Sequence, residues 1–319
     1  MTLSKLASIA HVSVSTVSKA FSMSPEVSDE TRELIFDIAK EHGCFKKYYN
    51  AKYSRYVIAV ICPEFRSRHY SRYTSLLQKE LSKYNCEICV TATDFLRKNK
   101  KNLVEYYDKY TRVDGMIIID QTADMVLTDE LPVVIMGARA VGTKGAFVVR
   151  NTDDAHKQAI EHFVEKGVKD IAFISEKHTV GKRDFFVRTM KKLVGQVDED
   201  FVVTVDERFE HGGYLAMKKI MESGKVPRAV ICGYDNMAIG AIRCILDRGL
   251  RVPQDVAVVG MDDNTESMYL NPPLASINPH VEEMCALAVD SLMKKIAGEP
   301  VERRRVVKAE LILRESAEV

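Results

Sequence analysis

Five polar side chains close to the N-terminus have types and spacing that suit contact with nucleic acid. They are Ser15, Thr16, Ser18, Lys19 and Ser22. Hydroxyl groups bind phosphate oxygens without base preference, whereas a lysine amine can donate to the O6 or N7 acceptors of guanine. Small hydroxyl-rich helices also occur on many protein surfaces. This pattern alone therefore favours DNA binding only moderately.

Two short helices joined by a tight turn would present these side chains together. Leu6 and Ala10 share one apolar face of the first predicted helix, and Ser13 stands where an N-cap opens the second. The second helix carries Val14 and Val17 and leaves the polar side chains on its outer side. This is the spacing of a helix-turn-helix.

A third helix is predicted to complete the head. Ser28 can cap it, and Asp29 and Glu30 suit its positive N-terminal end. An apolar stripe follows, and Gly43 ends the helix. We therefore predict a three-helix head over residues 1–43, whose core forms only if the helices contact one another.

The composition of the 319-residue chain indicates an ordinary globular protein of two or more domains. The apolar share is 46%, the charged share is 29% and the net charge is +1, so any contact with a polyanion must be local. We predict a cytoplasmic protein with no membrane contact, because we find neither a signal segment nor an apolar run long enough to span a bilayer. The spacing of Cys86 and Cys89 gives little support for a metal site.

Apolar strands alternate with amphipathic helices after residue 56, which indicates two parallel, doubly wound α/β lobes. The predicted strands are 57–62, 87–91, 116–119, 133–136 and 147–149 in one run, 171–174, 201–205, 229–232 and 256–260 in the next, and 305–309 and 311–313 after a helix over 281–296. Ligands of such sheets bind beyond the carboxyl ends of the strands, so the cleft between the lobes is the predicted pocket.

The predicted domain organisation follows from these runs. The head is joined by a basic and aromatic linker over 44–56 to a core over 57–319. One lobe of the core combines 57–149 with 279–305, and the other combines 150–278 with 306–319.

Seven separated motifs make the chain resemble the lactose-repressor (LacI/GalR) family of bacterial transcription regulators. They are Ala10–Lys19, Val27–Arg32, Val113–Ile117, Asp235–Ala241, Val252–Asp263, Asn271–Leu274 and Leu313–Ser316. The resemblance covers essentially the whole chain. It implies lobes of periplasmic-binding-protein type, a homodimer that reads a pseudo-palindromic operator in double-stranded DNA, and repression of carbohydrate-utilisation genes under a sugar or sugar-phosphate effector. It implies no cofactor, and the sequence does not say whether the effector releases or recruits the protein.

The resemblance also implies which head residues contact DNA. Val14, Ser15 and Lys19 would face bases in the major groove, although Val14 has the alternative of packing inside the head. The residues that would contact phosphates or fix the register are Thr2, Leu3, Thr16, Ser18, Ser22, Ser28, Thr31 and Arg32.

The linker departs from the family pattern. Members usually carry a hinge helix whose leucine wedges into the minor groove and kinks the DNA. Here only Asn50 and Ala51 match that pattern, and no leucine is present. Tyr49 or Tyr53 could serve as the wedge; otherwise specificity rests on the major groove.

The effector pocket keeps part of the family pattern and changes the rest. Arg183 and Asp262 stand at positions that usually bind sugar hydroxyls, whereas Tyr234 replaces an asparagine and Arg150 replaces an aspartate. Phe65 and Tyr70 complete the predicted set.

The charge near this pocket is unusual. Arg66, Arg68 and Arg72 follow the first core strand, and arginines favour phosphate or carboxylate. We therefore predict an anionic effector, with solvated arginines as an equally weighted alternative. For Asp235 we favour a helix-capping role.

Two other functions remain open at this point, and a third, catalysis, is not predicted. A sugar-binding protein without DNA activity would share the lobes but lack the head. A phosphocarrier protein could replace the small-molecule effector. We predict no enzyme, because we find no phosphate-binding glycine motif and no pairing of nucleophile and base, and His42, His69 and His211 are isolated.

Overall fold

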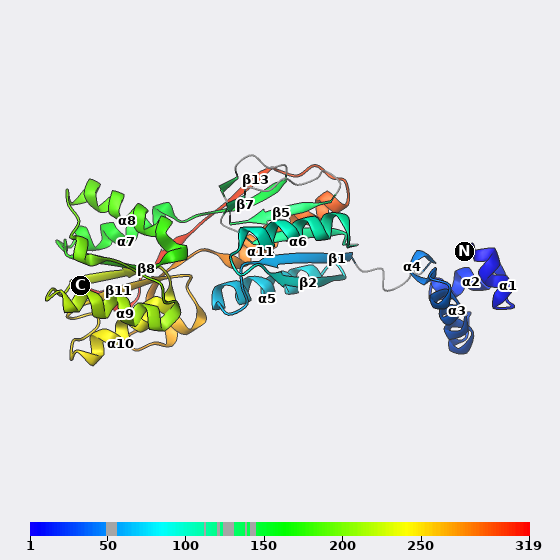
Figure 1. The fold of residues 1–319 in the computed structure, drawn as a ribbon, viewed down its shortest axis with the longest axis horizontal. Helices are drawn as coiled ribbons and strands as arrows, with labels where there is room; N and C mark the ends of the chain where they lie inside the picture. The colour runs from blue at the N-terminus through cyan, green and yellow to red at the C-terminus, as the bar shows by residue number, and fades with distance from the viewer. Residues whose placement is uncertain (49–55, 112, 120–121, 124–130, 138, 141–144) are drawn as a thin grey trace.

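The computed structural model describes residues 1–48, 56–111, 113–119, 122–123, 131–137, 139–140 and 145–319. These residues form a helical head and two α/β lobes, each built on a six-stranded sheet (Figure 1). The predicted fold class, a three-helix head with two doubly wound lobes, is confirmed.

The helices of the head begin where the sequence places their caps. They are α1 (Leu3–Ile9), α2 (Val14–Phe21) and α3 (Asp29–Glu41). The side-chain oxygens of Thr2, Ser13 and Ser28 accept bonds from backbone amides three residues later, at 3.3, 2.9 and 3.3 Å. Leu6 and Val17 are fully buried between the helices. Local capping and one shared apolar core thus fix the position of α2 and the direction of its outer side.

The first residues of the predicted linker fold onto the head. Cys44 is buried in the head core, and α4 (Phe45–Tyr48) follows it. The Phe45 ring lies 5.1 Å from that of Phe36, and Tyr48 Oη donates to Met1 O at 2.5 Å. The aromatic residues that marked a linker therefore extend the head to residue 48, because they bury apolar surface against it.

The first lobe is a parallel sheet in the order β13-β7-β5-β3-β1-β2. Its strands are β1 (Tyr56–Cys62), β2 (Cys86–Ala92), β3 (Gly115–Ile119), β5 (Val133–Met136), β7 (Ala146–Asn151) and β13 (Arg304–Lys308). Helices α5 (Arg68–Ser82), α6 (Arg97–Lys109) and α11 (Val281–Ile296) cover its faces (Figure 1). A separate two-stranded sheet pairs β4 (Thr122–Ala123) with β6 (Arg139–Ala140).

The second lobe has the sheet order β14-β12-β11-β10-β8-β9, with β14 antiparallel to β12. Its strands are β8 (Ile171–Glu176), β9 (Val202–Val205), β10 (Ala229–Cys232), β11 (Ala257–Met261), β12 (Ala275–Asn278) and β14 (Glu310–Ile312). The α-helices around it are α7 (Asp153–Val164), α8 (Val180–Leu193), α9 (Phe209–Glu222) and α10 (Asp235–Asp247). The short 3-10 helices η1 (Lys177–Thr179), η2 (Glu199–Phe201), η3 (Thr265–Tyr269) and η4 (Glu315–Ala317) complete it.

The chain passes between the two sheets after β7, after β12 and after β13. The sequence did not predict β12, because this strand is short and carries polar Ser276 and Asn278 within a buried run. β12 matters for the site, since it lies beside β11 and leads directly into the crossing that reaches α11.

Helices α9 and α10 cross at a contact that only glycine allows. A Cβ atom on Gly213 would lie 1.9 Å from Met237 O, and one on Gly240 would lie 1.8 Å from Glu210 O. Backbone atoms cannot move aside as a flexible side chain would, so this contact sets the distance between the two helices.

We expect Gly240→Ala to lower the free energy of unfolding by about 3 kcal/mol, the upper end of the usual overpacking cost, because the added methyl group overlaps backbone. Urea unfolding followed by circular dichroism measures the change. The matched control is Gly181→Ala in α8, where a Cβ atom meets nothing within 4 Å. Equal stability of the two variants would contradict this account of the α9 and α10 contact.

Candidate DNA-binding head and effector cleft

The outer side of α2 presents most of the predicted DNA-contacting side chains. Val14, Ser15, Ser18 and Ser22 are exposed. Val14 keeps 44% of its surface, so the alternative of packing inside the head is wrong. An exposed valine among hydroxyl groups suits contact with a thymine methyl group.

Lys19 lies on the same helix and is paired within the head. Its Nζ lies 2.5 Å from Glu26 Oε2, and both side chains remain well exposed. An exposed ion pair of this kind contributes little free energy, so Lys19 can exchange Glu26 for a base or phosphate at small cost.

Arg32 is used differently from the phosphate contact that the family resemblance implies. Its Nη2 donates to Ser24 O at 2.9 Å and to Val27 O at 2.8 Å, and Nη1 pairs with Asp29. Only 12% of the side chain is exposed. Arg32 therefore holds the loop between α2 and α3. The predicted contacts Asn50, Ala51 and Tyr53 lie outside the described residues.

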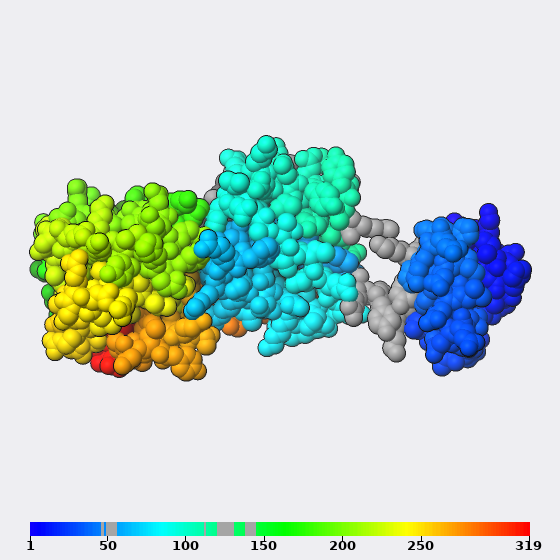
Figure 2. Space-filling view, turned by 60° about the horizontal axis from the view of Figure 1, so that its bottom comes forward, coloured from blue at the N-terminus to red at the C-terminus, as the bar shows by residue number. Residues whose placement is uncertain are grey.

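Two adjoining cavities lie at the carboxyl ends of the strands. The larger, about 210 Å³, is lined in the first lobe by the ends of β1 and β3 and by Phe95 and Lys100. The smaller, about 50 Å³, is lined by residues of both lobes and shares Tyr70, Phe95 and His178 with the first. The two lobes abut at this level of the molecule (Figure 2). We refer to the smaller cavity as the interlobe cleft.

Four of the six predicted effector residues line the interlobe cleft: Tyr70, Arg150, Tyr234 and Asp262. The other two do not. Phe65 is 55% exposed, and the guanidinium of Arg183 turns to Asp184 Oδ1 at 2.7 Å.

Lys182 lines the interlobe cleft instead of Arg183. Neighbouring residues on a helix point about 100° apart, so only one of the two can face the cleft. Lys182 Nζ donates to Gly233 O at 2.6 Å.

The three arginines after β1 do not converge on the interlobe cleft. Arg68 pairs with Glu266 of the other lobe at 2.8 Å, and Arg72 donates to Asp263 O at 3.0 Å. Arg66 lies 5.6 Å from the centre of the Phe209 ring. These side chains connect the two lobes, so they give no direct support to an anionic effector.

Asp262 is the centre of charge in the interlobe cleft. Its Oδ1 lies 3.2 Å from His69 Nδ1, on the opposite lobe, and Arg150 Nη1 lies 3.4 Å from His69 Nε2. Burial alone would raise the pKa of Asp262, but His69, Lys182 and Arg150 outweigh burial and hold that pKa at about 2. Burial in turn lowers the pKa of Lys182 to about 8.

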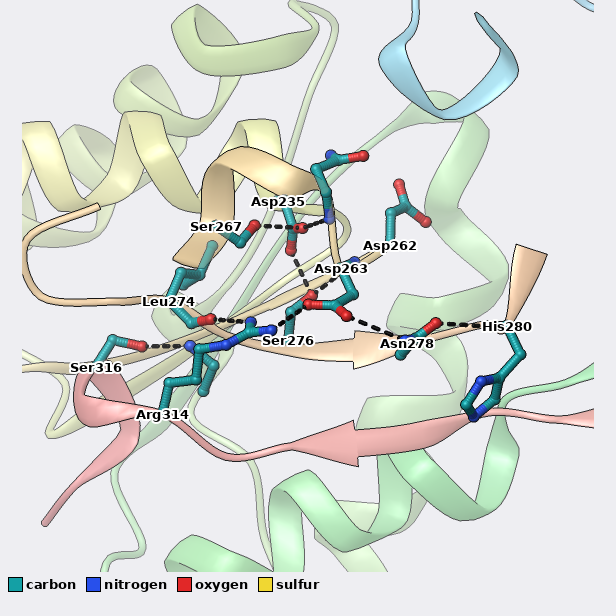
Figure 3. A network of polar contacts seen from close by, with 12 residues as sticks. Asp235, Asp262, Asp263, Ser267, Leu274, Ser276, Asn278, His280, Arg314 and Ser316 are labelled. Atoms are coloured by element: carbon teal, nitrogen blue, oxygen red, sulfur yellow. Dashed lines mark hydrogen bonds and ion pairs between the residues drawn. The ribbon is translucent and has the colours of Figure 1, made fainter. Parts of the chain in front are cut away.

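The predicted capping role of Asp235 is wrong. Its Oδ2 accepts bonds from Asn264 N and Ser267 Oγ, both at 2.7 Å, and its Oδ1 accepts from Ser276 Oγ at 2.6 Å (Figure 3). Burial, together with the charge of Asp262, raises the pKa of Asp235 to about 7. Although Asp235 begins α10, its carboxylate points away from the helix amides and fixes the turn that carries Asp262.

Comparisons with known proteins agree with this geometry. Residues 2–44 match the model of bacterial regulatory proteins, lacI family, and residues 160–317 match that of the periplasmic binding protein-like domain. This chain belongs to the lacI family. As a lacI-family member it is a DNA-binding transcriptional regulator, which disfavours the alternative of a sugar-binding protein without DNA activity.

Relatives of this lacI-family chain match it from end to end. The transcriptional regulator MalR of Clostridium butyricum is 24% identical and the probable transcriptional repressor ExuR of Bacillus subtilis is 25% identical. The alignments cover 99% of this chain in both cases, and 99% and 98% of those proteins.

Two solved structures share the fold. A complex of the transcriptional regulator CelR with cellobiose is 26% identical with a TM-score of 0.69, and it covers 99% of this chain and 100% of that one. A lac repressor dimer bound to operator and the anti-inducer ONPF is 21% identical with a TM-score of 0.78, covering 100% of this chain and 99% of that one.

The described residues of this lacI-family chain contain neither a membrane-spanning helix nor a cluster of metal ligands. No helix among those residues is long and apolar enough to cross a membrane. Within the same residues, no group of three or more His, Cys, Asp or Glu side chains could hold a metal ion.

Sequence reasoning missed a second part of the polar network behind the interlobe cleft. Arg314 donates to Asp263 Oδ1 and to Leu274 O, both at 2.6 Å, and Asn278 Nδ2 donates to Asp263 Oδ2 at 3.0 Å (Figure 3). The sequence did indicate that these residues matter, since the motif Val252–Asp263 contains Asp263 and the motif Leu313–Ser316 contains Arg314.

Buried His156, which lies near Lys182 and Arg150, makes the stability of the fold depend on pH. Burial, reinforced by the charge of Lys182, lowers the pKa of His156 to about 3 from an ordinary 6.5. Between these values the unfolded chain binds a proton at His156 and the folded chain does not, so acidification destabilises the fold.

We expect His156→Gln to reduce the stability lost between pH 7 and pH 5 by about 2 kcal/mol, since one pH unit of differential protonation corresponds to about 1.4 kcal/mol. Urea unfolding at both pH values measures this loss. The control His211→Gln changes an exposed histidine and should leave the pH dependence unchanged. His156 is not the cause of the pH dependence if His156→Gln loses as much stability between pH 7 and pH 5 as the wild type does.

Proposed function

We propose that this protein is a cytoplasmic repressor of carbohydrate-utilisation genes that acts by binding rather than by catalysis. It binds a pseudo-palindromic operator as a homodimer through α2, with Val14, Ser15 and Lys19 toward the bases. The dimer and the operator are proposed from the resemblance to the lac repressor structure, which is a dimer bound to operator.

We further propose that a small anionic sugar derivative in the interlobe cleft controls DNA binding. The supporting observation is that two cations of the cleft, Arg150 and Lys182, form no ion pair within 4 Å among the described residues. The phosphocarrier alternative has no comparable support. The CelR complex supports a saccharide as effector, because its ligand is cellobiose.

The control mechanism is a shift between conformations. An effector that binds better to one arrangement of the lobes favours that arrangement, and in a dimer this changes the spacing of the two heads. The free energy available equals the difference in the effector's affinity for the two arrangements.

We expect Lys19→Ala to weaken operator binding by about 1–3 kcal/mol and to relax base preference at one position of each half-site. The operator is first selected from genomic fragments retained by the protein, and fluorescence anisotropy then gives the affinity at fixed salt. The matched control is Lys40→Ala, which removes an exposed lysine of the same head from α3. If Lys19→Ala keeps the base preference of the wild type, α2 is not the recognition helix.

The effector class is tested with matched compounds. Isothermal titration should show galacturonate or glucose 6-phosphate binding at least about tenfold more tightly than galactose or glucose, because only a charged group can form an ion pair with Arg150 or Lys182. Arg150→Gln should reduce this preference. Equal affinity, or tighter binding of the neutral sugars, excludes the anionic effector.

A further inference from the structure

An ion pair from one lobe to the other lies beside the interlobe cleft. Arg208, immediately before α9, donates from Nη1 and Nη2 to the two oxygens of Glu64, each at 2.7 Å. Glu64 follows β1 in the other lobe and is only 7% exposed. A two-bonded pair that is largely shielded from water is much stronger than the exposed Arg68–Glu266 pair between the same lobes.

Two aromatic rings flank the guanidinium of Arg208. Its guanidinium lies 5.0 Å from the centre of the Phe95 ring and 4.6 Å from that of Phe209. These rings fix the plane of the guanidinium. Its Nε is buried and has no hydrogen-bond partner among the described residues, and Glu176 Oε2 lies 3.8 Å away. The donors of Arg208 are therefore not fully satisfied by the protein.

The charges that line the interlobe cleft indicate what could replace Glu64. Arg150, Lys182 and Arg208 are positive, and Glu176 and Asp262 are negative. His69 and His178, which also line it, have pKa values lowered by burial, which favours their neutral forms. Without Glu64, the lining carries one net positive charge, which a monoanion neutralises and a phosphate dianion overcompensates.

We propose that Glu64 is a built-in competitor of the effector, and that the effector is a sugar acid whose carboxylate takes the place of the Glu64 carboxylate on Arg208. This rests on the proposed function, in which the interlobe cleft binds a small anion. Arg208 can donate two bonds from Nη1 and Nη2 to either carboxylate, so only one of them can occupy this edge of the guanidinium at a time. Glu64 thereby sets the effector concentration at which the regulator responds.

Removal of the competitor should strengthen sugar-acid binding. We expect Glu64→Gln to bind at least one of galacturonate, glucuronate and gluconate at least about tenfold more tightly than the wild type in isothermal titration, because no carboxylate has to leave Arg208. The matched control Glu266→Gln removes the acid of the exposed interlobe pair and should bind like the wild type. Arg208→Gln, combined with Glu64→Gln, should lose the gain.

Three results would overturn the proposal. One is that Glu64→Gln, shown to be folded by circular dichroism, binds none of the three acids more tightly than the wild type does. A second is that it prefers glucose 6-phosphate to the sugar acids. A third is an equal gain in Glu266→Gln, which would assign the effect to looser lobes. The sugar acids could bind Glu64→Gln as expected without changing its affinity for the operator. That result would contradict effector control under the proposed function and would support the exchange of carboxylates on Arg208.

Discussion

The geometry of the interlobe cleft depends on one buried carboxylate, that of Asp235. It accepts three hydrogen bonds from the segment after β11 and from β12, and it is shielded from water. These bonds hold Asp262 and Asp263 in left-handed backbone conformations, with φ of 99° and 46°, which residues other than glycine seldom adopt without such restraint. From that turn Asp262 faces His69 of the opposite lobe, so a bond network inside one lobe determines a contact between the two.

Contacts between the lobes differ in what they contribute. Arg68–Glu266 is half exposed on both sides, so water and salt weaken it. Arg208–Glu64 is largely buried, and loss of one partner leaves a charge that needs another counter-charge. The buried contact between His69 and Asp262 also joins the two lobes. Under the proposed function, a small anion acts on the core by changing the buried Arg208–Glu64 pair, while the exposed pair stays in place.

The sequence predicted the parts of this molecule that depend on local rules. Ser13 and Ser28 were identified as helix caps because a cap needs only a hydroxyl and a helix start, and the parallel strands follow from apolar runs. Prediction from the sequence failed where the direction of a side chain determines whether it lines the cleft. Arg183 and Lys182 are adjacent and both basic, and only the rotation of α8 determines that Lys182 lines the cleft.

Contacts between residues far apart in the sequence could not be predicted from local patterns either. The role of Asp235 depends on Ser267 and Ser276, which lie about thirty and forty positions later, and β12 had not been predicted. The pairing of Glu64 with Arg208 joins two lobes across 144 positions, and no local pattern marks either residue. Physical reasoning from sequence thus identified the fold and the helical head, whereas the charge balance of the cleft required the structure.

Under the proposed function, the interlobe cleft and the DNA-binding head take part in one conformational equilibrium. The most direct test places a fluorophore pair on α6 and α9 of the full-length protein and records energy transfer and operator affinity in the same samples as a sugar acid is added. Both signals should change with the same midpoint, since one binding event shifts both. A change in the distance between the lobes that leaves operator affinity constant would contradict this coupling.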